Sequence, residues 1–244
     1  MTTMTADHIM TLSKMKSPHP QMKYAIKAEI TGMIKEGTSQ RTKPDKIREP
    51  QQKRSIEKKK RITEACIRLI GEQGYQKITT ADIAKEAGVS TGIVYSYFKN
   101  KRDILMAGLG EIVNTVSQPL YDCLEKFESE EDLMELMPGL IDSFAAFHKT
   151  FVKSHQELFS LAAVDPEIND YLEGFESRML SAFTEAYKRR HKELPHLKER
   201  FHLVYHMIET YCHESALTPS DEYDYGAMRE EVLSCIANLL KPQA

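Results

Sequence analysis

Residues 62–105 decide the fold, and they read ITEACIRLIGEQGYQKITTADIAKEAGVSTGIVYSYFKNKRDIL. In the first part, apolar residues recur at the three- and four-residue intervals of one helix face, and two glycines end the pattern. Thr79 and Asp82 have the spacing of a capping box, which predicts a short second helix through Ala87. The segment is therefore expected to form a compact group of helices.

A third short helix is predicted over residues 91–97, with Ser90 as its cap and Gly88 in the turn before it. A glycine permits the sharp turn, and small alanines let two helices cross closely, so the spacing is that of a helix-turn-helix. Side chains outside the shared core would face outward, where short residues approach base edges and tyrosine hydroxyls reach phosphates. We therefore predict a DNA-reading segment over residues 79–98.

Residues 62–105 as a whole resemble the TetR family of transcriptional regulators. The resemblance implies a DNA-binding helix-turn-helix at residues 79–98, a homodimer through the last two helices, and an inducer cavity among the middle helices. By position, it implies base reading at Thr91, Gly92 and Ile93 and phosphate contact at Tyr95, Tyr97 and Lys101. The full set of expected contacts to double-stranded DNA is Thr79, Thr80, Ser90, Thr91, Gly92, Ile93, Tyr95, Ser96, Tyr97 and Lys101.

The predicted reading helix contains neither Lys nor Arg between Ser90 and Phe98. It therefore cannot make the bidentate arginine–guanine contact, and we expect Ile93 and the Thr91 methyl group to favour thymine methyl groups in A·T-leaning half-sites. Positive charge lies on both flanks instead, where it could hold phosphates. These flanking residues are Lys53, Arg54, Lys58, Lys59, Lys60, Arg61, Lys99, Lys101 and Arg102.

The net charge of −3 is unevenly distributed along the chain. Residues 1–110 hold 21 Lys and Arg against 11 Asp and Glu, whereas residues 111–244 hold 12 against 25. A basic front and an acidic rear are typical of a polyanion-binding part attached to a part that does not bind. We predict an all-α protein with a basic extension at 1–50, a helix-turn-helix domain at 51–110, and a helical ligand-binding and dimerisation domain at 111–244.

Helical periodicity continues through the rear domain, and no strand pattern is present. Helices are expected over residues 101–127, with Pro119 as a kink or boundary, and then over 131–153, 154–164, 166–191, 195–217 and 221–241. A possible short helix over residues 22–35 lies in the extension. The last segment carries an apolar stripe expected to face a partner copy: Tyr225, Met228, Val232, Ile236 and Leu239.

Aromatic and methionine residues of the middle helices are the candidate lining of an inducer cavity, which would suit a mostly apolar small molecule. These candidate ligand-binding residues are Phe144, Phe147, His148, Phe175 and Met179.

A polar stripe on the helix expected at 195–217 contains His202, His206, Glu209 and His213. His202 and His213 would lie roughly 16 Å apart along the helix axis, so one metal ion could not bind both. Either half of the stripe, and likewise His148 with His155, would need ligands from elsewhere. We interpret the stripe as solvated or dimer-facing and predict no metal site and no cofactor.

The motifs of common enzymes, including G-x-S-x-G, G-x-G-x-x-G, H-E-x-x-H and the P-loop, do not occur, so no catalytic residue is predicted. Apolar runs are too short to span a bilayer, so no membrane association and a cytoplasmic location are expected. The function expected is a repressor released from a palindromic operator by a small-molecule inducer. The alternative is a DNA-bound regulator controlled by a protein partner or a metal ion.

Overall fold

The computed structural model describes residues 53–129, 131–191 and 194–241. The predicted basic extension and the possible helix over residues 22–35 lie outside the described residues. The described chain forms helices and no strands, which confirms the predicted all-α fold. The helices are α3 (Lys53–Gln73), α4 (Thr80–Glu86), α5 (Thr91–Tyr95), α6 (Lys101–Glu128), α7 (Leu133–Ala162), α8 (Pro166–Arg190), α9 (Leu197–Ala216) and α10 (Tyr225–Leu240).

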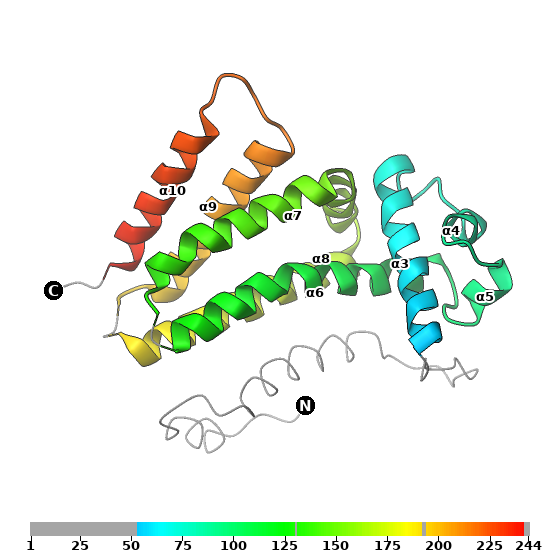
Figure 1. The fold of residues 1–244 in the computed structure, drawn as a ribbon, viewed down its shortest axis with the longest axis horizontal. Helices are drawn as coiled ribbons and strands as arrows, with labels where there is room; N and C mark the ends of the chain where they lie inside the picture. The colour runs from blue at the N-terminus through cyan, green and yellow to red at the C-terminus, as the bar shows by residue number, and fades with distance from the viewer. Residues whose placement is uncertain (1–52, 130, 192–193, 242–244) are drawn as a thin grey trace, which may run out of the picture.

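Two units lie along the length of the molecule (Figure 1). The helices α3, α4 and α5 form a small unit at one end, called the head here, and α7 to α10 form most of a larger unit, called the body. Helix α6 runs from the head into the body, and α7 lies alongside it. The head is therefore joined to the body through long helices rather than through a linker.

The head has its own apolar core, which follows the predicted helix periodicity. Ile62, Cys66 and Ile70 form the inner face of α3 and are fully buried, as are Ile83 of α4 and Val94 of α5. Leu158, Leu161 and Ala162 at the end of α7 and Ile168 of α8 belong to the same core. Body residues thus complete the packing of the head.

A close approach of α3 to α7 fixes the junction between the two units. The Ser154 hydroxyl donates to the Ile67 carbonyl oxygen at 3.0 Å. A Cβ atom on Gly71 would lie 2.8 Å from the Ser154 backbone nitrogen, so only glycine fits here without a shift of the helices. The second half of α7 is therefore held against the head.

Helix α7 covers the two helices that the sequence predicted over 131–153 and 154–164. Phe151 has non-helical angles (φ −113°, ψ 21°), and the helix is kinked there. The predicted break is thus a bend within one element, close to the position expected. Pro119 lies inside α6 and does not end that helix, which continues to Glu128.

The body core is built from α6 to α10, and Ile236 and Leu240 anchor α10 within it. The rest of the predicted α10 stripe, including Met228, Val232 and Leu239, is only partly buried against this core. Cys66, Cys123 and Cys212 are buried free thiols, and burial raises the pKa of each to about 12. Among the described helices, none combines the length and apolar character that crossing a membrane requires.

Candidate nucleic-acid interface and effector region

The turn that positions α4 is fixed by reciprocal hydrogen bonds, as the sequence predicted. The Thr79 backbone N–H donates to the Asp82 carboxylate at 2.8 Å, and the Asp82 N–H donates to the Thr79 hydroxyl at 3.2 Å. The Thr79 hydroxyl also donates to the Asp82 carboxylate at 2.6 Å, and this bond, followed by the one from the Thr79 N–H, lowers the pKa of Asp82 because both stabilise its charged form. Gly88 has a φ of +65°, the left-handed conformation expected at the end of α4.

Helix α5 is anchored on one side and bare on the other. Val94 is fully buried, and Phe98 just beyond the helix is 3% exposed, so both hold α5 against the head core. Thr91, Gly92, Tyr95 and Ser96 are exposed, whereas Ile93 and Tyr97 are half-buried. The predicted reading residues therefore share an outward surface, with Ile93 and Tyr97 at its edge.

The reading helix is shorter than predicted, because it ends at Tyr95 rather than at residue 97. A turn follows, in which the Tyr97 N–H donates to the Val94 carbonyl oxygen at 3.0 Å. The Ser90 hydroxyl caps the helix by accepting from the Ile93 N–H at 3.3 Å. Ser90 and Thr79 are thus already engaged as helix caps in the free protein, and Thr80 is half-buried at the start of α4.

Two of the nine flanking cations are engaged within the chain. The Lys101 ammonium donates to the carbonyl oxygens of Tyr75 and Ile78 at 2.7 and 2.9 Å and lies 4.2 Å from the Tyr75 ring centroid. Arg102 forms a bidentate ion pair with the Asp165 carboxylate, with hydrogen bonds of 2.6 and 2.9 Å, and also donates to the Glu167 carboxylate. Both residues therefore stabilise the protein's own fold, and Arg102 ties α6 to the start of α8.

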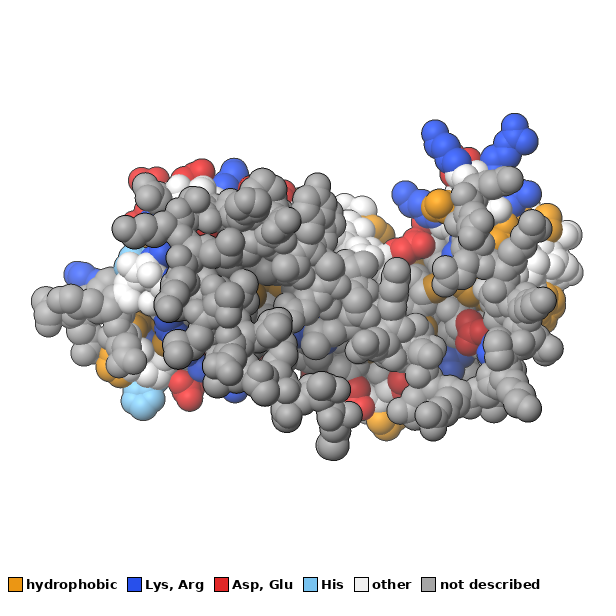
Figure 2. Space-filling view, turned by 90° about the horizontal axis from the view of Figure 1, so that it is seen from below, with side chains coloured by type: hydrophobic (Ala, Val, Ile, Leu, Met, Phe, Trp, Pro, Cys, Tyr) orange, Lys and Arg blue, Asp and Glu red, His pale blue; other side chains and the backbone are white. Residues whose placement is uncertain are grey.

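The other flanking cations lie at the start of α3 and just after α5. All are exposed except Lys59, which is half-buried and lies 5.6 Å from the Phe98 ring centroid. Lys60 is 3.6 Å from Glu64, and both of these side chains are largely exposed. Figure 2 shows Lys and Arg side chains projecting from the head end of the molecule. The free positive charge of the head thus lies mainly along α3.

The predicted cavity-lining residues separate into three environments. Phe144, Phe175 and Met179 lie in the packed body core. Phe147 lines an apolar pocket of about 40 Å³, which the sequence did not predict in this form. Its other lining residues are Leu109, Ile112, Phe151, His155, Leu158, Phe159 and Leu172. His148 lies beside this pocket, in a group of polar side chains.

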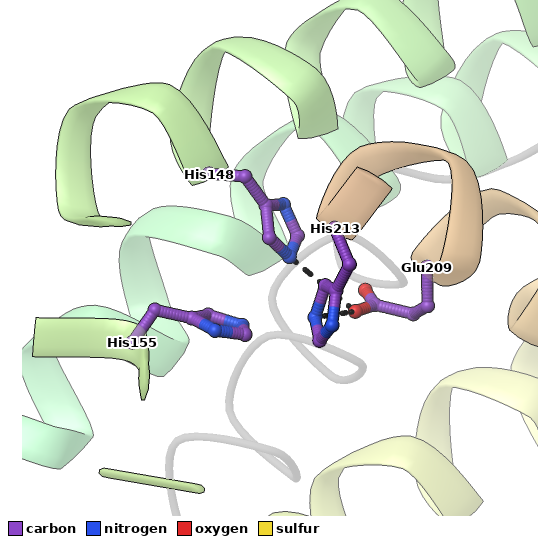
Figure 3. Close-up of side chains that lie close together, drawn as sticks. All are labelled: His148, His155, Glu209 and His213. Carbon is purple, nitrogen blue, oxygen red and sulfur yellow. Dashed lines mark ion pairs between the residues drawn. The ribbon is translucent and has the colours of Figure 1, made fainter. Parts of the chain in front are cut away.

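The histidine stripe of α9 is divided between two neighbours. His202 and His206 lie 3.4 and 3.6 Å from Glu176 of α8 and are about half exposed. Glu209 and His213 instead face α7, where they meet His148 and His155 (Figure 3). The residues that the sequence left without partners in two separate helices thus meet at one place.

The four residues His148, His155, Glu209 and His213 are called the α7–α9 cluster. Burial is the largest influence on the Glu209 pKa and raises it, but His148 and His213 together outweigh burial and lower the pKa to about 2. Burial lowers the pKa of His155 to about 4, with the neighbouring imidazoles adding to the effect. The cluster therefore combines a charged carboxylate with a neutral buried imidazole at neutral pH.

Comparison with known proteins agrees with the architecture. Residues 62–107 match the family described as "Bacterial regulatory proteins, tetR family". The chain is 31% identical over 119 residues to the fatty acid metabolism regulator protein of Bacillus subtilis, covering 47% of this chain and 60% of that protein. It is 42% identical over 64 residues to the HTH-type transcriptional regulator HbdR of Aromatoleum, covering 26% of this chain and 28% of that protein.

The chain thus spans less than two thirds of the length of these two relatives. A solved structure of a TetR-family regulator from Mesorhizobium loti shares the fold with a TM-score of 0.60 at 18% identity. That likeness covers 78% of this chain and 98% of the other. Residues 62–107 thus carry the segment typical of the TetR family of bacterial regulatory proteins, as the sequence resemblance implied, and the described helices share their fold with a TetR-family structure.

Proposed function

We propose that this protein is a DNA-binding transcriptional regulator whose helix α5 enters the major groove. The outward face of α5 carries the proposal, because Thr91, Gly92 and Tyr95 are exposed while Val94 beneath them is fully buried. Helix-turn-helix proteins approach base edges with a short helix whose inner face is packed on the domain core and whose first residues have small side chains, and α5 has both features.

The functional unit in this proposal is a homodimer formed through α9 and α10. Two-fold symmetry would place the two α5 helices in successive major grooves, about 34–36 Å apart, on a palindromic operator. The incomplete burial of Met228, Val232 and Leu239 by their own chain supports this arrangement, because it leaves apolar surface for a partner helix.

Base reading in this proposal relies on apolar contact rather than on charge. Thr91 and the half-buried Ile93 would contact thymine methyl groups, so the half-sites should be A·T-leaning. Tyr95 and Tyr97 would donate to phosphates. Because Arg102 and two donors of Lys101 are engaged internally, most of the phosphate charge would be neutralised by α3 and Lys99.

We further propose that DNA binding represses transcription and that a mostly apolar small molecule releases it. The apolar pocket supports such an inducer, as does the name of the Bacillus subtilis relative, a regulator of fatty acid metabolism. An inducer of ordinary size needs more room than this pocket offers, so it would have to part α7 from α6 and α8, whose residues line the pocket. Since α7 also packs on the head, this movement would shift the position of α5. The coupling free energy between inducer binding and DNA binding would be roughly 1–3 kcal/mol.

A second candidate is a regulator whose effector is a metal ion rather than an organic molecule. The specific observation in its favour is the α7–α9 cluster, which has three imidazoles and one carboxylate. A protein partner bound to the acidic body is a further alternative, although no single contact in the described chain favours it.

The test is binding of the purified chain to DNA that flanks its own gene, measured by footprinting and by fluorescence anisotropy. Tyr95→Ala should weaken binding about tenfold or more, the loss expected for a hydrogen bond to a charged group. The matched control is Tyr223→Ala, because Tyr223 in the loop before α10 is 55% exposed and Tyr95 is 57% exposed. A wild-type dimer that binds no duplex at low salt, or equal losses in both variants, would contradict the proposal.

A further inference from the structure

The α7–α9 cluster brings three imidazole rings from two helices into mutual contact (Figure 3). The ring centroids of His148 and His155 are 4.6 Å apart, those of His155 and His213 are 4.7 Å apart, and those of His148 and His213 are 5.1 Å apart. Each of the four side chains offers one ligand atom, and these four atoms all lie within 4.8 Å of one another.

The three imidazoles keep nitrogen atoms that are buried and have no hydrogen-bond partner. They are His155 Nδ1, which has no ion pair either, and His148 Nε2 and His213 Nε2, each of which lies 3.4 Å from Glu209 Oε2 in an ion pair without a hydrogen bond. The His148 and His155 side chains are deeply buried, with residue exposures of 1% and 9%. Since a buried polar atom without a partner is destabilising, its presence here points to a ligand that the protein alone does not supply.

The kink of α7 makes this meeting possible. Along a straight helix, seven residues rise about 10.5 Å, so His148 and His155 would share a face without touching. The non-helical Phe151 lies between them and bends the helix, and their ring centroids are 4.6 Å apart. The bend therefore brings His148 and His155 close enough together to contribute to the same site.

The spacing of the ligand atoms fits a tetrahedral metal ion. With metal–ligand bonds of about 2.0–2.1 Å, tetrahedral ligand atoms lie about 3.4 Å apart. Glu209 Oε2 lies 3.4 Å from His148 Nε2 and 3.4 Å from His213 Nε2. Glu209 Oε2 thus already lies at the required distance from two of the three histidine ligand atoms. His155 is the side chain that would move inward to complete the site.

His148 is also held in the orientation that a metal ligand needs. Its Nδ1–H donates to the Phe144 carbonyl oxygen at 2.9 Å, which leaves the lone pair of Nε2 directed into the cluster. Metal-binding histidines commonly have such a hydrogen bond from the ring nitrogen that does not bind the metal, because it fixes the tautomer and the ring plane.

We propose that the α7–α9 cluster binds one divalent transition-metal cation per chain, with Zn²⁺ as the best-matched ion. Three imidazoles and one carboxylate are a donor set suited to zinc, and the two ligand-atom separations of 3.4 Å match a four-coordinate ion, whereas ions that require six oxygen ligands do not suit three nitrogen donors. The sequence interpretation of the α9 stripe as solvated or dimer-facing then holds only for its first half.

The bound ion would connect the head-packed half of α7 to the body. His155 follows the kink, and the next turn of α7 contributes Leu158 and Leu161 to the head core. His148 precedes the kink, and Glu209 and His213 come from α9. An ion held by all four would therefore fix the bend angle, and with it the position of the head relative to α9.

The test is a titration of the chelator-stripped full chain with zinc alone, measured by isothermal titration calorimetry. We expect one ion per chain and a weakening of at least about 100-fold in His213→Ala, more than outer-sphere substitutions commonly cause. His202→Ala is the matched comparison, because it removes a histidine of the same helix that belongs to a second, more exposed group of ligand atoms, Glu176, His202 and His206, outside the cluster. The proposal would be overturned if the wild-type chain bound no zinc, or if zinc affinity fell in His202→Ala but not in His213→Ala.

A conservative variant separates loss of the site from loss of the fold. Glu209→Gln keeps the shape of the side chain but removes its charge, so zinc affinity should fall while the helical circular dichroism of the chain is unchanged. Cobalt substituted for zinc should give the strong visible absorption of a four-coordinate ion in the wild type. A weak, six-coordinate spectrum would contradict an ion held by the four side chains.

A regulatory consequence rests on the proposed DNA-binding function. The Kd for the operator should differ at least about fivefold between stripped and zinc-loaded protein, the lower end of allosteric couplings. The zinc titration requires no DNA, so the two proposals can fail separately. Zinc binding without any DNA binding would contradict the proposed DNA-binding function but not the proposed metal site. Equal DNA affinities of the stripped and zinc-loaded protein would contradict only the coupling between them.

Discussion

The head and the body differ in how completely their polar side chains are paired. In the head, the Thr79 and Ser90 hydroxyls cap helices, and the Arg68 guanidinium of α3 donates to the Glu86 carboxylate of α4 at 2.8 Å. In the body, the α7–α9 cluster keeps His155 Nδ1 buried without a partner, and His148 Nε2 and His213 Nε2 share the Glu209 carboxylate at 3.4 Å without a hydrogen bond. An unpaired buried group costs about 1–3 kcal/mol. The polar groups of the head are thus paired as folded, whereas the body would gain stability from the proposed ion in the α7–α9 cluster.

This difference locates the responsive part of the molecule. His155 belongs to the cluster and also lines the apolar pocket, so an ion and an apolar ligand would meet at one side chain. Both lie at the kink of α7, beyond which the helix packs on the head. An effector at this place would act on the least satisfied region of the described chain and leave the paired interior of the head unchanged.

The largest expected effect tests the apolar core on which the paired head depends. Ile83→Ala should lower the free energy of unfolding by about 2–5 kcal/mol, because Ile83 is fully buried and its loss leaves a cavity. Urea unfolding followed by circular dichroism measures the change. Ile56→Ala makes the same substitution at a residue that is 56% exposed, and it should stay within about 0.5 kcal/mol of the wild type. Similar losses in both would show that α4 is not anchored as described.

The next prediction reverses the usual sign of a core substitution. His155→Leu should raise the free energy of unfolding by about 1 kcal/mol in the presence of a chelator, because it removes a buried nitrogen without a partner. With zinc present, the same variant should be less stable than the wild type. His206→Leu serves as the control, since His206 is about half exposed and should change little in either condition. Destabilisation of His155→Leu in chelator would mean that the imidazole is already satisfied.

An effect of similar size but opposite sign is expected at the cap of α4. Thr79→Ala should lower stability by about 1 kcal/mol, because the Asp82 N–H loses its acceptor. Thr79→Ser retains the hydroxyl and should differ by only a few tenths. Chemical denaturation of the three proteins side by side distinguishes a capping effect from a packing effect. If serine were as damaging as alanine, the methyl group rather than the hydroxyl would be responsible.

The smallest effect concerns the pair that joins α6 to α8. Hydrogen bonding from Arg102, the largest influence, lowers the pKa of Asp165 to about 2 from 3.8. A depressed pKa in the folded state means that the pair stabilises fully above about pH 4 and loses this contribution as the pH falls toward 2. Arg102→Met should therefore lower Tm by only about 1–2 °C at pH 6, because the pair is partly exposed to solvent. The difference from wild type should narrow between pH 4 and pH 3 in thermal unfolding scans, and a constant difference would contradict the assignment.

Much of the head could be predicted because its signals are local. The capping box of Thr79 and Asp82, the left-handed Gly88 and the buried face of α3 all depend on residues a few positions apart. The end of α5 was predicted too late, because the turn after Tyr95 still forms a backbone bond that resembles a helical one. Lys101 and Arg102 were grouped with free cations, since nothing local indicates that their partners are Tyr75, Ile78 and Asp165.

The sequence by itself determined that the protein is all-helical, where most helices begin, and which face of α5 is bare. Those properties follow from backbone hydrogen bonds and apolar periodicity within single helices. Only the tertiary structure decided that α7 bends at Phe151, that the α9 stripe divides, and that its Glu209 and His213 meet two histidines of α7. The bend angle and the pairing of α7 with α9 depend on how whole helices pack, and no short stretch of residues encodes that.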